Sequence, residues 1–176
     1  FVSKETAIVI NNWFMMYFLA VVLIGTIYPI FLEVITKEKI SVGPPYFNQL
    51  IIPLLIPFLF IMSIGTKLDW IKNKEINVRY KKIVLLILSV LISYLIAKHL
   101  NTKILYSTVL MSAALYLLFI SILDLKNDKL KWSQKTSHLA FSILIISIIL
   151  NSIFSEEQSV NLKAGEEKKL SKYTIR

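Results

Sequence analysis

His138 is the residue of this chain with the clearest chemical potential, because it lies inside a long uncharged segment. That segment, Thr136–Ser155, contains no acid, lysine or arginine. Its length suits a helix that crosses a hydrocarbon core of roughly 30 Å at about 1.5 Å per residue. A polar ring in such a helix needs a partner, and a neutral imidazole is a common ligand of metals, including haem iron. The alternative is a histidine near the membrane surface that is hydrogen-bonded to a neighbouring helix.

Other metal or catalytic chemistry is sparse. The chain has no cysteine, which excludes disulfides, thiol chemistry and cysteine-based metal sites. The chain has one other histidine, His99, which lies beside Lys98 in a predicted turn and is interpreted as a solvated surface residue. The acids are scattered through loops, and there is no P-loop, dinucleotide fingerprint, zinc-protease motif or nucleophile elbow. The chain alone therefore cannot build a multi-histidine metal site, and no catalytic residue is predicted.

The composition indicates an integral membrane protein. Of the 176 residues 56% are hydrophobic and only 18% are charged, and the mean hydropathy is +0.66. In a soluble protein a formal net charge of +9 would suggest nucleic acid as a partner. Here the lysines and arginines lie mainly between apolar runs, where they set topology and contact lipid headgroups, so no nucleic-acid partner is expected.

The apolar runs predict an all-α membrane region over residues 1–155, with about five transmembrane helices, followed by the start of a β unit. Pro29 is expected to bend or end the first helix, and Pro53 and Pro57 to kink the second. An alternating pattern over residues 156–176 predicts a fragment of an extracytoplasmic β-hairpin. The helices are expected at about 8–32, 48–65, 83–97, 104–123 and 136–155.

Loop charges predict the orientation of these helices. The loops Lys67–Lys82 and Asp124–Lys135 hold six and four basic residues, whereas Glu33–Lys39 and Lys98–Lys103 hold two each. By the positive-inside rule the first pair is cytoplasmic. Residue 1 is therefore expected inside and the tail after Ser155 outside.

The outer loop that precedes the second helix contains a Gly-Pro-Pro run, which predicts an extended turn rather than a helix. Two aromatic residues follow it and could present a flat binding surface at low entropic cost. The loop is either a rigid connector or part of a surface for a partner. The residues of this predicted partner surface are Gly43, Pro44, Pro45, Tyr46, Phe47 and Asn48.

Six runs in this order resemble the CcmF family, the haem lyase proteins of cytochrome c maturation. The loop SVGPPYFN and the histidine-bearing helix before a V-x-L-x-x-G-E strand are the most specific parts. The resemblance covers nearly the whole chain and is to the C-terminal part of the family. The runs are SKETAIVINNWFMM, GTIYPIF, KISVGPPYFNQLIIPLLIPFLFIMSIG, TKLDWIKN, SHLAF and FSEEQSVNLKAGEEKKLSKYTIR.

The resemblance implies a concrete function. Family members attach haem to apocytochromes c on the outer face of the bacterial or mitochondrial inner membrane. They receive haem, their substrate, from a haem chaperone and work with a thiol-handling subunit that presents the apocytochrome. They also hold a b-type haem between two transmembrane histidines, and His138 matches the second of these. Because the first is absent here, the missing N-terminal half is an expected partner, and the chain is expected to be a fragment.

Helical spacing adds neighbours to that haem site. Phe141, Ser142 and Ile145 share a face with His138, together with Ile149, and are predicted to wall an apolar pocket. Lys135, just upstream with Lys131 and Trp132, is predicted to pair with haem propionates.

A different class of function remains open, namely a transporter or scaffold subunit without a redox cofactor. Two prolines in the second helix would suit the broken helix of a substrate site. A visible spectrum separates the two possibilities, because only a haem protein gives sharp reduced bands.

Overall fold

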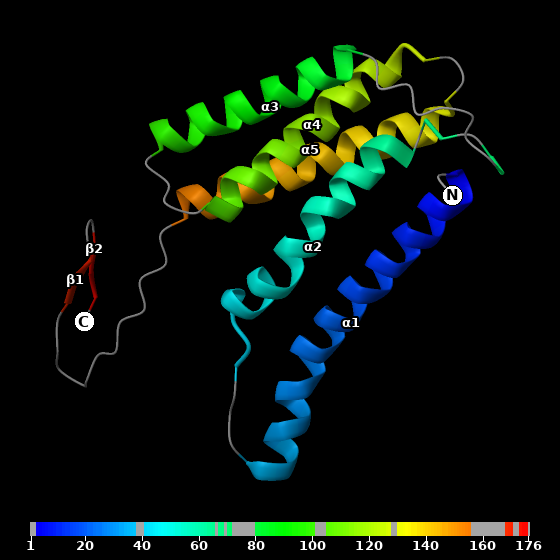
Figure 1. Ribbon diagram of the computed structural model, residues 1–176. Helices are drawn as coiled ribbons and strands as arrows, with labels where there is room; N and C mark the ends of the chain where they lie inside the picture. Colours follow the sequence, from blue (N-terminus) through cyan, green and yellow to red (C-terminus); the bar gives the residue numbers. More distant parts are fainter. Residues whose placement is uncertain are drawn as a thin grey trace.

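The computed structural model describes residues 3–37, 41–65, 67–68, 70–71, 80–100, 105–127, 130–155, 168–170 and 173–175. Its helices are α1 (Lys4–Thr36), α2 (Pro44–Gly65), α3 (Tyr80–His99), α4 (Leu105–Leu125) and α5 (Trp132–Phe154). All five are long and apolar enough to cross a membrane (Figure 1). The predicted all-α, multi-pass membrane fold is therefore confirmed.

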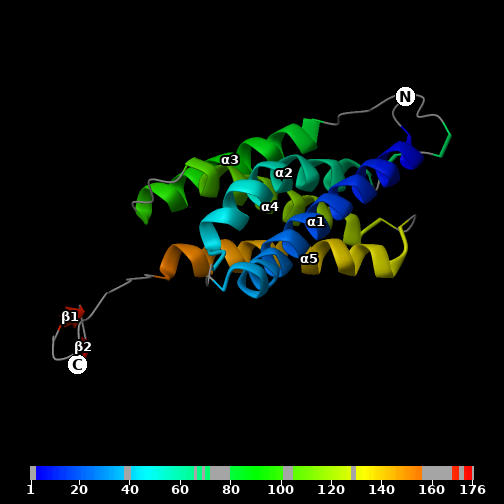
Figure 2. The ribbon, with the colours of Figure 1, turned by 90° about the horizontal axis from the view of Figure 1, so that it is seen from below.

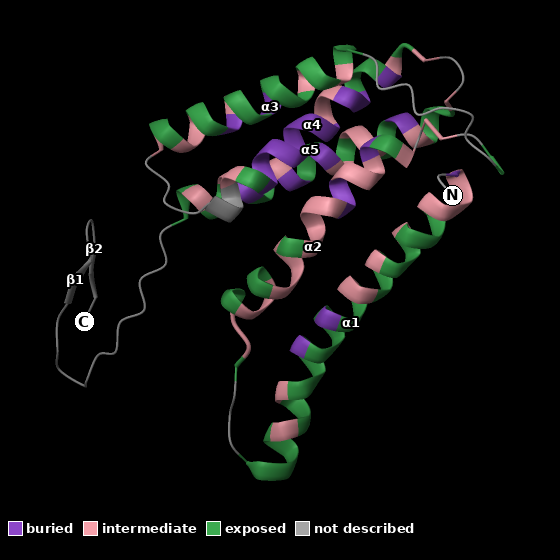
Figure 3. Ribbon diagram, in the orientation of Figure 1, coloured by how far each residue is buried: buried purple, intermediate pink, exposed green. Residues whose placement is uncertain are grey.

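Helix α4 is the centre of the bundle. It contacts α2, α3 and α5, and both Figure 1 and the turned view of Figure 2 place it between α3 and α5. In Figure 3 most of its residues are buried, whereas α1 and α3 are largely exposed. The apolar core gathers around α4, to which α2 adds Leu59 and α5 adds Ile145 and Ile149. The exposed apolar side chains of the outer helices suit contact with lipid tails.

Small polar residues allow α3 and α5 to approach α4 closely. Ser89 and Ser93, one turn apart on α3, are almost fully buried, and so is Ser142 on α5. The Ser93 hydroxyl donates to the carbonyl oxygen of Thr108 on α4. In a lipid environment helices associate through such tight contacts and hydrogen bonds, because the tails are as apolar as leucine.

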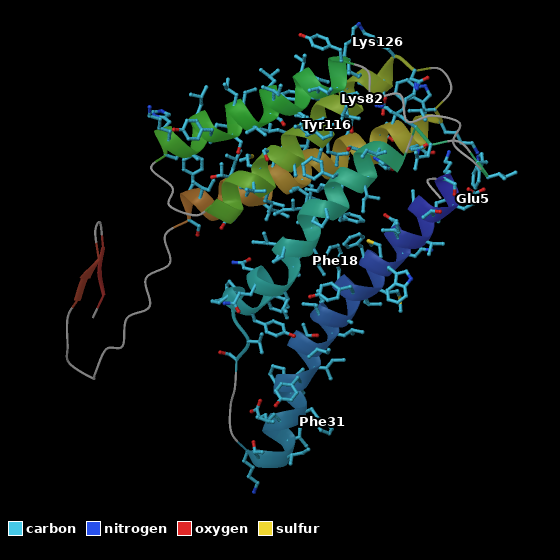
Figure 4. All side chains as sticks on the ribbon, in the orientation of Figure 1. Glu5, Phe18, Phe31, Lys82, Tyr116 and Lys126 are labelled. Carbon is cyan, nitrogen blue, oxygen red and sulfur yellow. The ribbon has the colours of Figure 1, made fainter. Side chains whose placement is uncertain are left out.

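Helices α1 and α2 pack side by side through aromatic rings. Phe58 of α2 is buried and lies 5.5 Å from the Phe14 ring and 5.7 Å from the Phe18 ring of α1, measured between centroids. On its other side Phe58 meets Phe141 of α5 at 6.1 Å. Figure 4 labels Phe18 where α1 and α2 lie close together. Phe58 thus links three helices.

The prediction of an extended turn over Gly43–Asn48 is wrong beyond Gly43. Helix α2 begins at Pro44, so both prolines lie in its first turn. A proline there costs little, because the first N–H groups of a helix have no partner within the helix. The Tyr46 N–H donates to the Gly43 carbonyl oxygen at 3.2 Å and helps to close this turn.

The alternative that Pro29 ends the first helix is also wrong. Helix α1 continues to Thr36 and stops only at Lys37, whose φ is 60° and whose N–H bonds to the Glu33 carbonyl oxygen. At roughly 50 Å, α1 is longer than the hydrocarbon core of a bilayer. Figure 1 shows its C-terminal end running past the first turn of α2.

Two short antiparallel strands follow the helices, β1 (Lys168–Leu170) and β2 (Tyr173–Ile175). Their register pairs Lys168 with Ile175 and Leu170 with Tyr173. Residues 156–167, the first part of the predicted β unit, lie outside the described residues. The extracytoplasmic β unit over 156–176 stays a prediction.

Candidate functional site

His138 is held near the start of α5. The helix begins at Trp132 after Lys131, four residues earlier than expected. His138 therefore lies roughly 9 Å along the helix from its first residue. Within the described chain no hydrogen bond of the imidazole is found, so the structure gives no support to the alternative of a histidine bonded to a neighbouring helix. The ring is half-buried and lines a cavity.

The cavity lies where α1, α2 and α5 meet, and its volume is about 220 Å³. It is open to the outside of the bundle. Its apolar walls come from α1 and from the last turns of α2. The lining residues are Lys4, Ala7, Ile8, Asn11, Ile61, Met62, Gly65, Gln134 and His138.

The predicted neighbours of His138 do not line this cavity. Ser142 and Ile145 are buried instead, Ile145 within the core around α4, and Phe141 packs on Phe58. Residues three and four apart on a helix share a face, but a face can turn gradually from one contact to another along its length. At His138 the face of α5 meets α1 and α2, while at Ile145 it meets the core around α4.

Lys135 is buried and occupied by other groups. Its Nζ donates to the Leu125 carbonyl oxygen at 3.1 Å and lies 5.3 Å from the centre of the Trp132 ring. A lysine at this position donates to a carbonyl that has no partner within α4. Its positive charge also interacts favourably with the negative end of the helix dipole. The structure thus places Lys135 as a cap of α4.

A partly buried ion pair ties the segment just after α2 to α4 at the same end of the bundle. The Lys67 Nζ lies 3.1 Å from the Asp124 Oδ1, and the two side chains are 22% and 10% exposed. Removing one partner leaves a partly buried charge without compensation, which is destabilising.

Replacing Asp124 with asparagine is expected to destabilise the bundle by roughly 3 kcal/mol, because Lys67 then keeps a half-buried charge without its partner. Reversible unfolding of the purified protein in mixed detergent measures this loss. The double variant Lys67→Met, Asp124→Leu is expected to recover most of it, because no unpaired charge remains. A single variant as stable as the native protein would show that the pair contributes nothing.

The segment after α2 folds over the start of α1, next to the cavity. The Ile71 N–H donates to both carboxylate oxygens of Glu5, at 2.9 and 3.1 Å. Lys4 Nζ lies 5.2 Å from the centre of the Trp70 ring. The φ of Ile71 is 69°, an unusual value for a β-branched residue. Figure 4 shows Glu5 at this end of α1.

The predicted partner surface is partly buried within the chain. Tyr46 and Phe47 pack on α1, where a Cβ added to Gly25 would come within 2.8–2.9 Å of their rings. Pro44, Pro45 and Asn48 are exposed. The aromatic rings thus serve the contact between α1 and α2, and only the prolines and Asn48 remain open to a partner.

The residues fit one side of a haem site. His138 offers a free imidazole between apolar walls, and His99 lies at the opposite end of the bundle. Among the described residues no three His, Cys, Asp or Glu side chains form a metal site. The cavity is smaller than the roughly 300–1,000 Å³ of ordinary small-molecule pockets. It would therefore hold only part of a haem, and further polypeptide would have to complete the site.

Comparisons with known proteins agree with the resemblance predicted from the sequence. The cytochrome c-type biogenesis protein CcmF of Escherichia coli is 24% identical over 97% of this chain, and that of Pseudomonas fluorescens is 29% identical over 97%. The chain is similar to CcmF. The protein CycK of Rhizobium meliloti, also named for cytochrome c-type biogenesis, is 25% identical over 99% of the chain. The resemblance to the C-terminal part of the CcmF family is confirmed.

The chain spans only 28–29% of the length of these three relatives. No family model matches the chain. No solved structure matches it either.

The sequence did not reveal most of the cavity. Lys4, Asn11 and Gln134 are polar residues near or within apolar runs, and this position was the available signal. Their convergence on His138 depends on how α1 and α5 are rotated against each other. No periodicity of a single helix contains that information.

Proposed function

We propose that this chain acts in cytochrome c maturation, as the C-terminal portion of a haem lyase subunit that attaches haem covalently to apocytochromes c. The observation that carries this proposal is the similarity of nearly the whole chain to proteins named for cytochrome c-type biogenesis. The relatives are much longer, so the complete activity requires polypeptide beyond these 176 residues. No residue of this chain is proposed to be catalytic.

His138 is proposed to provide one axial ligand of a b-type haem within the membrane, with a histidine outside this chain as the other. That haem would supply one-electron chemistry. The imidazole is free to bind it, and Ile8, Ile61 and Met62 give the ligand apolar walls. Phe141 positions the helix by its contact with Phe58.

The proposed location is the bacterial inner membrane, or the mitochondrial one for an organelle-encoded chain. The proposed partners are the haem chaperone, the subunit that presents the apocytochrome, the apocytochrome itself and the N-terminal half of the lyase subunit. The exposed residues Pro44, Pro45 and Asn48 are the available part of the outer surface for these contacts.

A transporter or scaffold without a cofactor is the competing function. Pro53 and Pro57 give this alternative little support, because α2 is continuous from Pro44 to Gly65 rather than broken into two half-helices. The deciding experiment is a reduced-minus-oxidised visible spectrum of the native membrane complex. Sharp bands of a bis-histidine haem support the lyase subunit, and a featureless spectrum favours the transporter.

Residues 1–176 expressed alone are expected not to hold haem at one-to-one stoichiometry. His138 supplies one ligand, and the cavity of about 220 Å³ covers only part of the macrocycle. The measurement is haem per polypeptide by pyridine haemochrome after gel filtration in detergent, with the native complex as the control. Stoichiometric haem in the isolated chain would contradict a ligand set shared with another segment.

A further inference from the structure

Four polar side chains converge on one cavity without partners in the described part of the chain. His138 and Gln134 lie one turn apart on α5, and Lys4 and Asn11 lie two turns apart on α1. No hydrogen bond or ion pair of these four side chains is found among the described residues, and the Lys4 ammonium contacts only the Trp70 ring there. Polar groups within membrane-spanning helices are costly unless they are satisfied. A ligand would satisfy them together.

The charge in this cavity identifies the kind of group that is missing. Among the described residues that line the cavity Lys4 is the only charged one, and no described carboxylate pairs with it. The adjacent carboxylate of Glu5 is occupied by the Ile71 N–H. The Trp70 ring holds the Lys4 ammonium in place without neutralising it, since a cation–π contact leaves the full charge. The cavity therefore suits an anion that can also accept a hydrogen bond from Gln134.

The placement of these groups along the helices gives the cavity two ends. Lys4 is the first residue of α1 and Gln134 the third residue of α5, so both lie at the end of the bundle. His138 is one turn deeper on α5, beside apolar walls. A ligand with a metal in an apolar body and carboxylates at one edge matches this order, because its charged edge faces the membrane surface.

We infer that Lys4 and Gln134 bind a propionate carboxylate of the haem whose iron His138 ligates. This inference rests on the proposed function and adds to it the residues that orient the haem. Lys4 forms a charge-assisted ion pair with the carboxylate, Gln134 donates an amide hydrogen bond, and Trp70 fixes the lysine. Lys135, which the sequence predicted for this role, is occupied by the end of α4.

The test compares Lys4→Gln with Lys4→Arg in the native membrane complex, by redox titration of the b-haem and by haem content. A positive charge beside a propionate stabilises the reduced haem, so Lys4→Gln is expected to lower the midpoint potential and to weaken haem retention by roughly tenfold. Lys4→Arg keeps the positive charge, so its midpoint potential and haem retention are expected to match those of the native protein. The matched control is Lys81→Gln, which removes a charge in the first turn of α3, outside the cavity, and should leave the potential unchanged.

The outcomes separate this inference from the function on which it rests. An unchanged potential in Lys4→Gln overturns it, and so does a loss of haem that Lys4→Arg does not repair, because that loss reflects structure rather than charge. If Lys4→Gln does not accumulate, Gln134→Leu carries the test, with weakened retention of haem expected and native retention overturning the inference. Haem bands that persist in His138→Ala would instead refute the ligand assignment itself.

Discussion

Replacing His138 with alanine is expected to abolish the absorbance of the b-haem in the native complex. The variant removes the only imidazole that lines the cavity between α1, α2 and α5. A haem held by two axial histidines loses its low-spin state when one is removed, and an open cavity on that side offers little else to retain it. The measurement is the reduced-minus-oxidised spectrum at equal protein concentration. The expected result is complete loss of the paired-histidine bands.

Two controls separate ligation from folding. His99→Ala should keep the full spectrum, because His99 is exposed at the far end of α3. Free imidazole added to His138→Ala should restore part of the band, because it can enter the space that the ring has left. An unchanged spectrum in His138→Ala removes the ligand assignment. Loss of the band together with native-like gel filtration and recovery by imidazole establishes it.

The type and number of the membrane-spanning elements were predictable because they depend on local properties. An uncharged apolar run of this length forms a helix in lipid, since a helix satisfies its backbone hydrogen bonds within a single segment. The prediction also recognised that His138 is unusual from its position within such a run. These conclusions need no knowledge of the neighbouring helices.

The errors arose where prolines met helix ends. Pro44 and Pro45 indicated an extended turn, but the first N–H groups of a helix need no internal partner, so α2 includes both. Pro29 deprives the Gly25 carbonyl of its usual donor, yet α1 continues to Thr36. Proline interrupts a helix reliably only where the lost hydrogen bond cannot be tolerated, and a membrane helix packed on a neighbour tolerates it.

Of the residues predicted for the haem site, only His138 lines the cavity. The face of α5 alone predicts Phe141, Ser142 and Ile145, but Ser142 is buried elsewhere and the other two pack on neighbouring helices instead of lining the cavity. The residues that do line it come mostly from α1 and α2, some 70 to 130 positions earlier in the chain. The rotation and pairing of helices depend on close contacts such as Phe58 with Phe14, which a single sequence does not display.

Replacing Gly25 with leucine is expected to separate α1 from α2 and to cost at least about 3 kcal/mol. Even a Cβ at this position would lie 2.8 Å from the Phe47 ring and 2.9 Å from the Tyr46 ring, well inside contact distance. Leucine adds three further carbons, so both rings and the first turn of α2 must move. Helix α1 makes its main contacts with α2, and it has few other contacts to hold it in place.

The Gly25→Leu substitution should also disturb the site of His138, although Gly25 itself does not line the cavity. Helix α1 provides one wall of the cavity, through Ala7, Ile8 and Asn11, so its displacement opens the site to lipid and water. Gly25→Leu is therefore expected to lower the free energy of unfolding in mixed detergent. It is also expected to reduce the b-haem content several-fold. Ile24→Phe is the matched control, because Ile24 is 58% exposed and added bulk there faces outward. If Gly25→Leu kept native stability and haem, the contact between Gly25 and the two rings would not hold α1 in place. If it lost stability but kept its haem, α1 would not be a wall of the haem site, and Lys4 could not be a ligand of the propionate.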